Sequence, residues 1–117
     1  MKHLIAALLL SLALPAAADP PKVEAVRASP DTDGWRFDVT LSHPDSGWEH
    51  YADGWRVLDM NGNELGLRVL FHPHEADQPF TRSLGNVQIL QGTQQVQIQA
   101  RCIVDGWNTK TTLVTLP

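Results

Sequence analysis

Two histidines separated by one proline, in the segment His72-Pro73-His74-Glu75, have the type and spacing best suited to chemistry. In an extended chain, side chains two residues apart lie on one face, roughly 6–7 Å apart along the backbone. Two imidazoles in that arrangement supply half of a zinc or copper site, because both ions bind imidazole nitrogen. Proline fixes φ and stiffens the spacing. The segment therefore predicts metal binding through His72, His74 and Glu75.

Further ligands are needed to complete such a site, because structural zinc usually takes four. His43 or His50 could complete the set with Glu75 if the loops converge. Cys102 is a poor further ligand, because strand alternation points it inward and a buried thiol behaves as a small apolar group. The alternative is a solvated loop whose histidines hydrogen-bond to backbone or water. Copper or zinc is the one cofactor that the sequence suggests. The interpretation in which the protein has no cofactor is favoured over metal binding.

A surface for a ligand or partner is the second candidate. Trp48 and Trp107 lie in or beside turns that contain glycine, where a partner can reach them, and large aromatic residues are enriched at interfaces. Aromatic residues also fill cores, and we expect Trp35 and Trp55 inside. Arg82, in a long segment without regular structure, is available to hydrogen-bond to carbonyl groups. Trp48, Arg82 and Trp107 are therefore the predicted contacts for a periplasmic protein or a small ligand.

Motifs for catalysis and for calcium find little support. No G-x-S-x-G nucleophile motif occurs, and no set of residues shows convergent catalytic roles. We therefore expect no enzymatic activity. Asp31-Thr32-Asp33-Gly34 has the composition of half a calcium loop, but the distal Glu that such a loop needs does not follow. A turn is the better interpretation of this segment.

Length and charge limit the classes of function. The 117 residues include 9 Lys+Arg and 13 Asp+Glu, which gives a formal net charge of -4. A chain of this length forms one domain. Nucleic-acid binding is not expected, because it needs a clustered positive face. The single cysteine excludes a disulfide within the chain.

Residues 1–18 have the three parts of a secretory signal peptide. A basic start, Met1-Lys2-His3, precedes an apolar run over residues 4–14, and Ala16-Ala17-Ala18 supplies small residues for cleavage. The run is too short for a membrane span, which needs roughly 20 apolar residues. The alternative is a retained signal-anchor helix. We expect cleavage after Ala18, which leaves one domain over residues 19–117, periplasmic or secreted and without a membrane anchor.

The mature chain is predicted to form strands and turns. Trp35, Phe37, Val39 and Leu41 alternate with polar residues, which is typical of a half-buried strand. Asn61-Gly62-Asn63 predicts a hairpin. The other expected strands cover residues 22–29, 55–60, 65–71, 85–90, 95–104 and 110–116, with an irregular segment over 72–83. About seven strands at intervals of roughly 8–12 residues predict an all-β antiparallel sandwich, immunoglobulin-like or fibronectin-III-like, although the cysteine pair of antibody domains is absent.

Three segments resemble a group of small exported bacterial proteins of unknown function: residues 51–55 (YADGW), residues 56–59 (RVLD) and residues 72–83 (HPHEADQPFTRS). Those proteins share the HPHExxQPFTRS segment and end in a Leu-Pro strand much like residues 115–117. The resemblance covers most of the mature chain and implies a β-sandwich and export, but no activity. Members carry polar residues, including histidine, in the turn where this chain has residues 102–105. A metal site that used that turn would be incomplete here.

Three classes of function therefore stay open. The first is an exported binding or interaction module, the second a metal-handling protein, and the third an exported enzyme, and the fold cannot choose among them. The irregular segment is expected to pack on itself as a crossover between the sheets, with Phe80 over the core. The oligomeric state is undetermined, since an edge strand over residues 22–29 or 110–116 could pair with a copy of itself.

Overall fold

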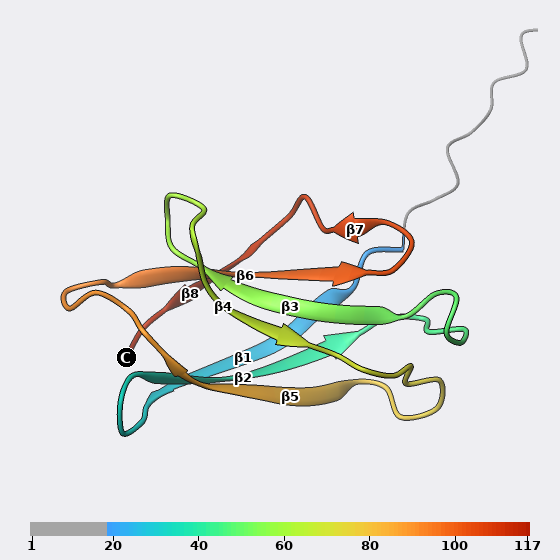
Figure 1. Cartoon of the computed structure of the whole chain (residues 1–117), viewed down its shortest axis with the longest axis horizontal. Coiled ribbons are helices and arrows are strands. Elements are labelled where there is room, and N and C mark those ends of the chain that lie inside the picture. Colours follow the sequence, from blue (N-terminus) through green and yellow to red (C-terminus); the bar gives the residue numbers. More distant parts are fainter. Residues whose placement is uncertain (1–18) are drawn as a thin grey trace, which may run out of the picture.

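The computed structural model describes residues 19–117, so the predicted leader and its cleavage site lie outside the described residues. Eight strands form two packed layers (Figure 1). No helix in the described part of the chain is long and apolar enough to cross a membrane. The strands are β1 (Lys22–Pro30), β2 (Trp35–Ser42), β3 (Ala52–Leu58), β4 (Glu64–Val69), β5 (Phe80–Val87), β6 (Gln95–Cys102), β7 (Gly106–Trp107) and β8 (Thr112–Thr115).

The two sheets are antiparallel and confirm the predicted sandwich. One sheet has the order β1-β2-β5, and the other has β4-β3-β6-β7, with β8 also paired to β6. Because β7 and β8 pair with opposite ends of β6, they form two halves of one interrupted last strand. The fourth strand lies beside the third, whereas in the constant-type immunoglobulin arrangement it lies beside the fifth. The order is therefore fibronectin-III-like, with seven strands when the last two are counted together.

The core lies between the two layers and follows the predicted alternation. Phe37, Val39 and Leu41 of β2 are fully buried, and Val96 and Ile98 of β6 are buried in the same core cluster. The polar residues between them lie on the outer faces, as the period of two along a strand requires. Of the two tryptophans expected inside, Trp55 is fully buried and Trp35 packs partly buried against the core.

The strand expected over residues 55–60 begins earlier, because Asp53 and Gly54, two residues typical of turns, lie within β3. Gly54 is paired with Val69 on one side and with Arg101 on the other. A Cβ atom at Gly54 would lie 2.9 Å from Nε of Arg101. The glycine therefore allows the arginine side chain to approach the sheet closely, and it does not form a turn here.

The strand expected over residues 85–90 is instead β5, which begins at Phe80 and ends at Val87. Residues 80–83, including Arg82, therefore lie in a strand and not in the irregular segment expected over residues 72–83. Phe80 is buried and pairs with Leu41, so its side chain holds the start of the strand on the core, as expected. At the other end, Asn86 has a positive φ of 55°. Leu90 beyond it is 86% exposed and belongs to no strand. Core contact by Phe80 and Val87 therefore sets the ends of this strand, and the apolar character of residues 89–90 does not extend it.

The packing predicts a large cost for truncating a core residue. Phe37→Ala removes a fully buried ring from the middle of the core and should lower the free energy of unfolding by about 3–5 kcal/mol. Leu90→Ala, at a largely exposed site, is the matched control and should change it by less than about 0.5 kcal/mol. Urea denaturation followed by tryptophan fluorescence measures both. Equal effects of the two variants would contradict the assigned core.

Candidate metal centre

Three loops meet at one end of the sandwich, here called the loop end (Figure 1). Backbone hydrogen bonds join them to their neighbours. The N–H of Ile103 donates to the carbonyl of Tyr51 at 3.1 Å, and the N–H of Leu70 donates to the carbonyl of Asp53 at 3.0 Å. The loops are residues 43–51 between β2 and β3, residues 70–79 between β4 and β5, and residues 103–105 between β6 and β7.

His43, His50 and Cys102 come together at the loop end and are called the His-His-Cys cluster. Their potential ligand atoms all lie within 4.8 Å of one another. His43 is 4% exposed and Cys102 is 1% exposed, while His50 is half-buried. The two imidazole rings meet edge to face, with their centroids 4.8 Å apart. Zinc and similar ions take nitrogen at about 2.0–2.1 Å and sulfur at about 2.3 Å, so small side-chain adjustments would bring all three atoms onto one ion.

The Nε2 atoms of His43 and His50 are buried and have no hydrogen-bond partner among the described residues. A buried polar atom without a partner costs free energy, and in native proteins such an atom calls for an explanation. In His43 the other ring nitrogen, Nδ1, lies 2.6 Å from a carboxylate oxygen of Asp45. A carboxylate only accepts, so Nδ1 carries the proton and Nε2 presents its lone pair in the neutral ring. This is the tautomer that binds a metal ion.

The carboxylate of Asp45 is the centre of the hydrogen bonding around the cluster. Its Oδ1 accepts from Nδ1 of His43 and from the N–H of Ala52 at 2.9 Å, and its Oδ2 accepts from the N–H of His74 at 2.8 Å. The side chain of Asp45 is fully buried. Its position is therefore fixed by two backbone groups, and it fixes in turn the orientation of the His43 ring.

Gln78 joins the loop over residues 70–79, here called the long loop, to the segment that begins with His43. Its Oε1 accepts from the N–H of His43 at 3.0 Å, and its Nε2 donates to the carbonyl of His74 at 2.7 Å. The backbone of residue 43 is thus held from the long loop, while its ring is held from Asp45. Segments far apart in the sequence therefore set the geometry of one ligand.

Cys102 is the last residue of β6, and the turn that follows the strand contacts its sulfur. The N–H of Asp105 donates to Sγ at 3.4 Å, and Oδ2 of the same residue lies 3.5 Å from Sγ. Burial raises the pKa of the Cys102 thiol above its usual range. The thiol is therefore protonated in the metal-free protein, and a bound ion would have to displace the proton.

The predicted metal-binding residues of the long loop are placed differently. His72 is exposed, and its Nδ1 lies 3.2 Å from the carbonyl oxygen of Pro73. The two loop imidazoles have centroids 4.5 Å apart, but His74 is buried and stacks on Phe80. Glu75 is exposed. The potential ligands that gather in residues 19–117 are those of the His-His-Cys cluster, so metal binding by His72, His74 and Glu75 stays a prediction.

Both nitrogens of His74 already face partners. Its Nδ1 lies 2.9 Å from Oδ2 of Asp77, and its Nε2 lies 3.4 Å from a guanidinium nitrogen of Arg82. The hydrogen bond to this imidazole lowers the pKa of the Asp77 carboxyl. The loop therefore packs on itself and on Phe80, as the sequence predicted.

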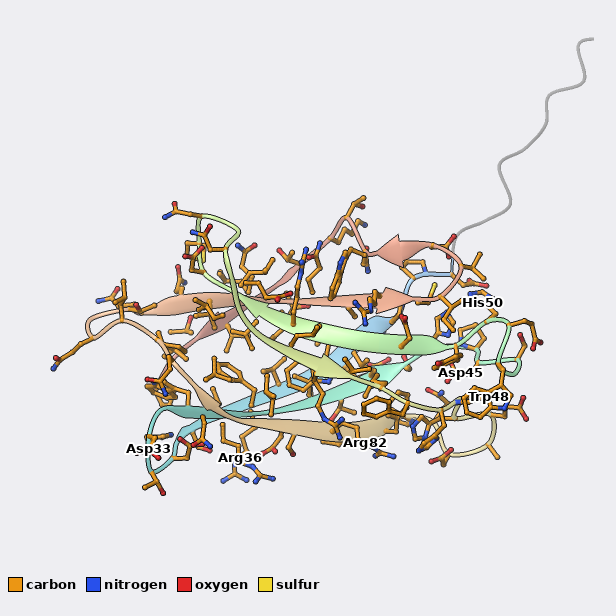
Figure 2. All side chains as sticks on the ribbon, viewed as in Figure 1. Asp33, Arg36, Asp45, Trp48, His50 and Arg82 are labelled. Carbon is orange, nitrogen blue, oxygen red and sulfur yellow. The ribbon has the colours of Figure 1, made fainter. Side chains whose placement is uncertain are left out.

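The predicted partner contacts lie on three different elements, and Figure 2 labels two of the three, Trp48 and Arg82. Trp48 is 66% exposed in the loop before β3 and meets Tyr51 edge to face. Trp107 of β7 is half-buried, with the guanidinium of Arg56 3.9 Å from its ring centroid. Arg82 of β5 donates to its neighbouring carbonyl, at Thr81, at 2.7 Å. The proposed role of these residues as partner contacts stays a prediction.

Sequence reasoning missed the His-His-Cys cluster because it treated inward orientation as evidence against Cys102. The inward orientation is confirmed, but Cys102 is the final inward residue of β6 and pairs with Ala52. That position faces the loop end instead of the middle of the core. The available signal was a cysteine at the end of a buried strand, together with His43 directly after another strand.

Comparisons with known proteins show a distant similarity and no family. No protein-family model matches the chain, and no solved structure gives a significant match. A protein of Halomicrobium mukohataei named "Putative lipoprotein" is 39% identical over 71 residues, which cover 61% of this chain and 34% of that protein. The chain thus spans about a third of the length of this relative.

Burial of the thiol predicts slow chemical modification. In the metal-free native protein, Cys102 should react with a soluble disulfide reagent far more slowly than in urea, because 1% exposure and a raised pKa suppress attack by the thiolate. Thiol titration by absorbance measures both rates. Comparable rates in the native and unfolded protein would contradict the buried position.

The bonding of Asp45 predicts a specific sensitivity to loss of charge. Asp45→Asn should lower the free energy of unfolding by about 2 kcal/mol, because an amide NH₂ would face one of three hydrogen-bond donors in a buried site. Asp33→Asn is the control, since Asp33 is exposed at the opposite end of the sandwich (Figure 2). Urea midpoints compare the two variants, and equal midpoints would show that Asp45 does not have the assigned role.

Proposed function

We propose that this chain is an exported, non-catalytic binding module whose ligand is a transition-metal ion held by the His-His-Cys cluster. The observation that carries the proposal is that His43, His50 and Cys102 each bring one ligand atom to within 4.8 Å of the other two. Nε2 of both imidazoles is buried and has no hydrogen-bond partner among the described residues. Imidazole and thiolate are the preferred ligands of zinc and copper among protein side chains. Metal binding thus keeps copper or zinc as the cofactor suggested by the sequence, but at a different set of residues.

The charge around the cluster supports a cation. Within the described residues, no lysine or arginine lies within ion-pair distance of Asp45, and His43 is its one basic partner. A buried carboxylate without a positive partner is costly. A metal ion on Nε2 of His43 would place positive charge on the far side of the ring, in a carboxylate–histidine–metal arrangement.

Solvent approaches the cluster on the side of His43, through a hollow whose lining does not include His50 or Cys102. An open hollow of about 380 Å³ lies beside His43 and is lined by Pro20, Lys22, Ser42, His43, Pro44 and Gln78. His50 is half-buried, so the cluster lies under a thin cover at the loop end. Entry therefore requires adjustment of the loop over residues 43–51 and leaves the core intact.

Export is supported by two independent features. The leader-like residues 1–18 are one, and the name of the Halomicrobium mukohataei relative, "Putative lipoprotein", is the other, because lipoproteins lie outside the cytoplasm. The compartment implied is the periplasm or the exterior of the cell.

Titration of the protein with zinc and cuprous ions tests the proposal. The wild-type protein should bind one equivalent in competition with a chromophoric chelator, and Cys102→Ala and His50→Gln should each weaken the affinity for that ion. His72→Ala is the matched control, because it removes an exposed histidine outside the cluster and should leave the affinity unchanged. Circular dichroism of each variant checks that it folds.

Two results would overturn the proposal. One is the absence of stoichiometric binding of any of these ions by the folded wild-type protein. The other is uptake that persists in folded Cys102→Ala and His50→Gln but is lost in His72→Ala, which would move the site to the long loop.

A further inference from the structure

We propose that the ion of the His-His-Cys cluster is copper, bound by three protein ligands in both its cuprous and cupric states. This inference rests on the proposed metal binding and names the ion. The first support is the number of ligands. The cluster groups three potential ligands in the described residues, whereas structural zinc sites are closed by four. Two histidines and one cysteine in a trigonal arrangement are typical of copper.

The donor atoms favour copper for a second reason. A thiolate is a soft ligand that suits cuprous ion, and imidazole suits both oxidation states of copper. Within the described residues, the one methionine, Met60, follows β3 at the end away from the cluster, so its thioether is not a ligand. The exposed carboxylate of Asp105 contacts the sulfur, with Oδ2 3.5 Å from Sγ. Among the described residues, the nitrogen and sulfur ligands that gather here are therefore those of His43, His50 and Cys102.

Hydrogen bonds hold the imidazoles of His43 and His50 in place before any ion binds. A fixed set of ligands favours an ion such as copper, which changes its oxidation state while bound. Asp45 orients the ring of His43. His50 is positioned by a tight turn, in which its N–H donates to the carbonyl of Gly47 at 3.2 Å and its carbonyl accepts from the N–H of Ser46 at 3.0 Å. Gly47 has a φ of 132°, a conformation that favours glycine. A frame of this kind keeps the same three ligands in both oxidation states.

Burial protects the thiolate from the usual reaction with cupric ion. In that reaction two thiolates each give one electron to a cupric ion, so that one disulfide bond forms and two cuprous ions are produced. The chain has one cysteine, and Cys102 is 1% exposed, so neither a second thiolate of the same chain nor one of a neighbouring copy can reach it. A cupric–thiolate complex would therefore persist in this site.

Anaerobic addition of cupric ion to the full protein tests the inference. One equivalent should produce an intense visible absorption band, because charge transfer from a thiolate to cupric ion absorbs strongly. The band should be absent in Cys102→Ala, retained in His72→Ala, and bleached by a reductant without loss of the bound ion. Asp45→Asn, which disturbs the partner of His43, should lower copper affinity by about 10–100-fold.

The failure of this inference is distinguishable from failure of the proposed function. If the cluster binds zinc stoichiometrically but cupric ion gives no band, or gives a band that Cys102→Ala retains, the copper assignment is overturned and metal binding stands. If the folded wild-type protein binds neither zinc nor copper in either oxidation state, both are overturned.

Discussion

A single buried carboxylate holds the loop end together. Asp45 accepts hydrogen bonds from an imidazole, from the backbone at the start of β3, and from the backbone of the long loop at His74. Each partner comes from a different part of the loop end, and each would be left unsatisfied if the carboxylate were absent. Hydrogen bonds to a buried charge are stronger than neutral ones, so this residue links folding of the loops to the shape of the cluster.

The long loop over residues 70–79 serves the cluster indirectly. Its polar groups are mostly used internally or on the neighbouring loop, through Gln78 and His74. Phe80 anchors its far end on the core, and the ring of His74 stacks on Phe80 with centroids 3.9 Å apart. The segment that looked most like a ligand pair is therefore, in this structure, a strap that supports the proposed ligands. This division of roles explains why a pattern of histidines alone could not indicate the His-His-Cys cluster.

The sequence was sufficient for the fold where the pattern is local. Alternation in β2 and β6 gave the buried faces, and Asn61-Gly62 gave the hairpin, in which Gly62 has a φ of 85° and Asp59 accepts from the N–H groups of Asn61 and Asn63. The sequence was not sufficient where a contact between residues far apart in the chain sets the bounds of a strand. Gly54 looks like a turn residue until Arg101 lies against it, and the start of β5 depends on the core site of Phe80. The cluster is the extreme case, because Cys102 lies 52 positions beyond His50 in the numbering and only the pairing of β3 with β6 brings them together.

The cluster is anchored unequally on its two sides. Cys102 ends a strand that pairs with β3, β7 and β8, so the sulfur moves only with the larger sheet. Both imidazoles belong to one connecting loop, and His50 is held there by one short turn, through its isolated bridge to Gly47 and the hydrogen bond from the N–H of Ser46 to its carbonyl. Departure of a bound ion would therefore begin with dissociation of His50, and the bond from the ion to the sulfur would break last. If the cluster binds an ion as proposed, the residence time of the ion would be governed by the opening rate of one short turn, and tightening that turn would slow release without any change in the ligands themselves.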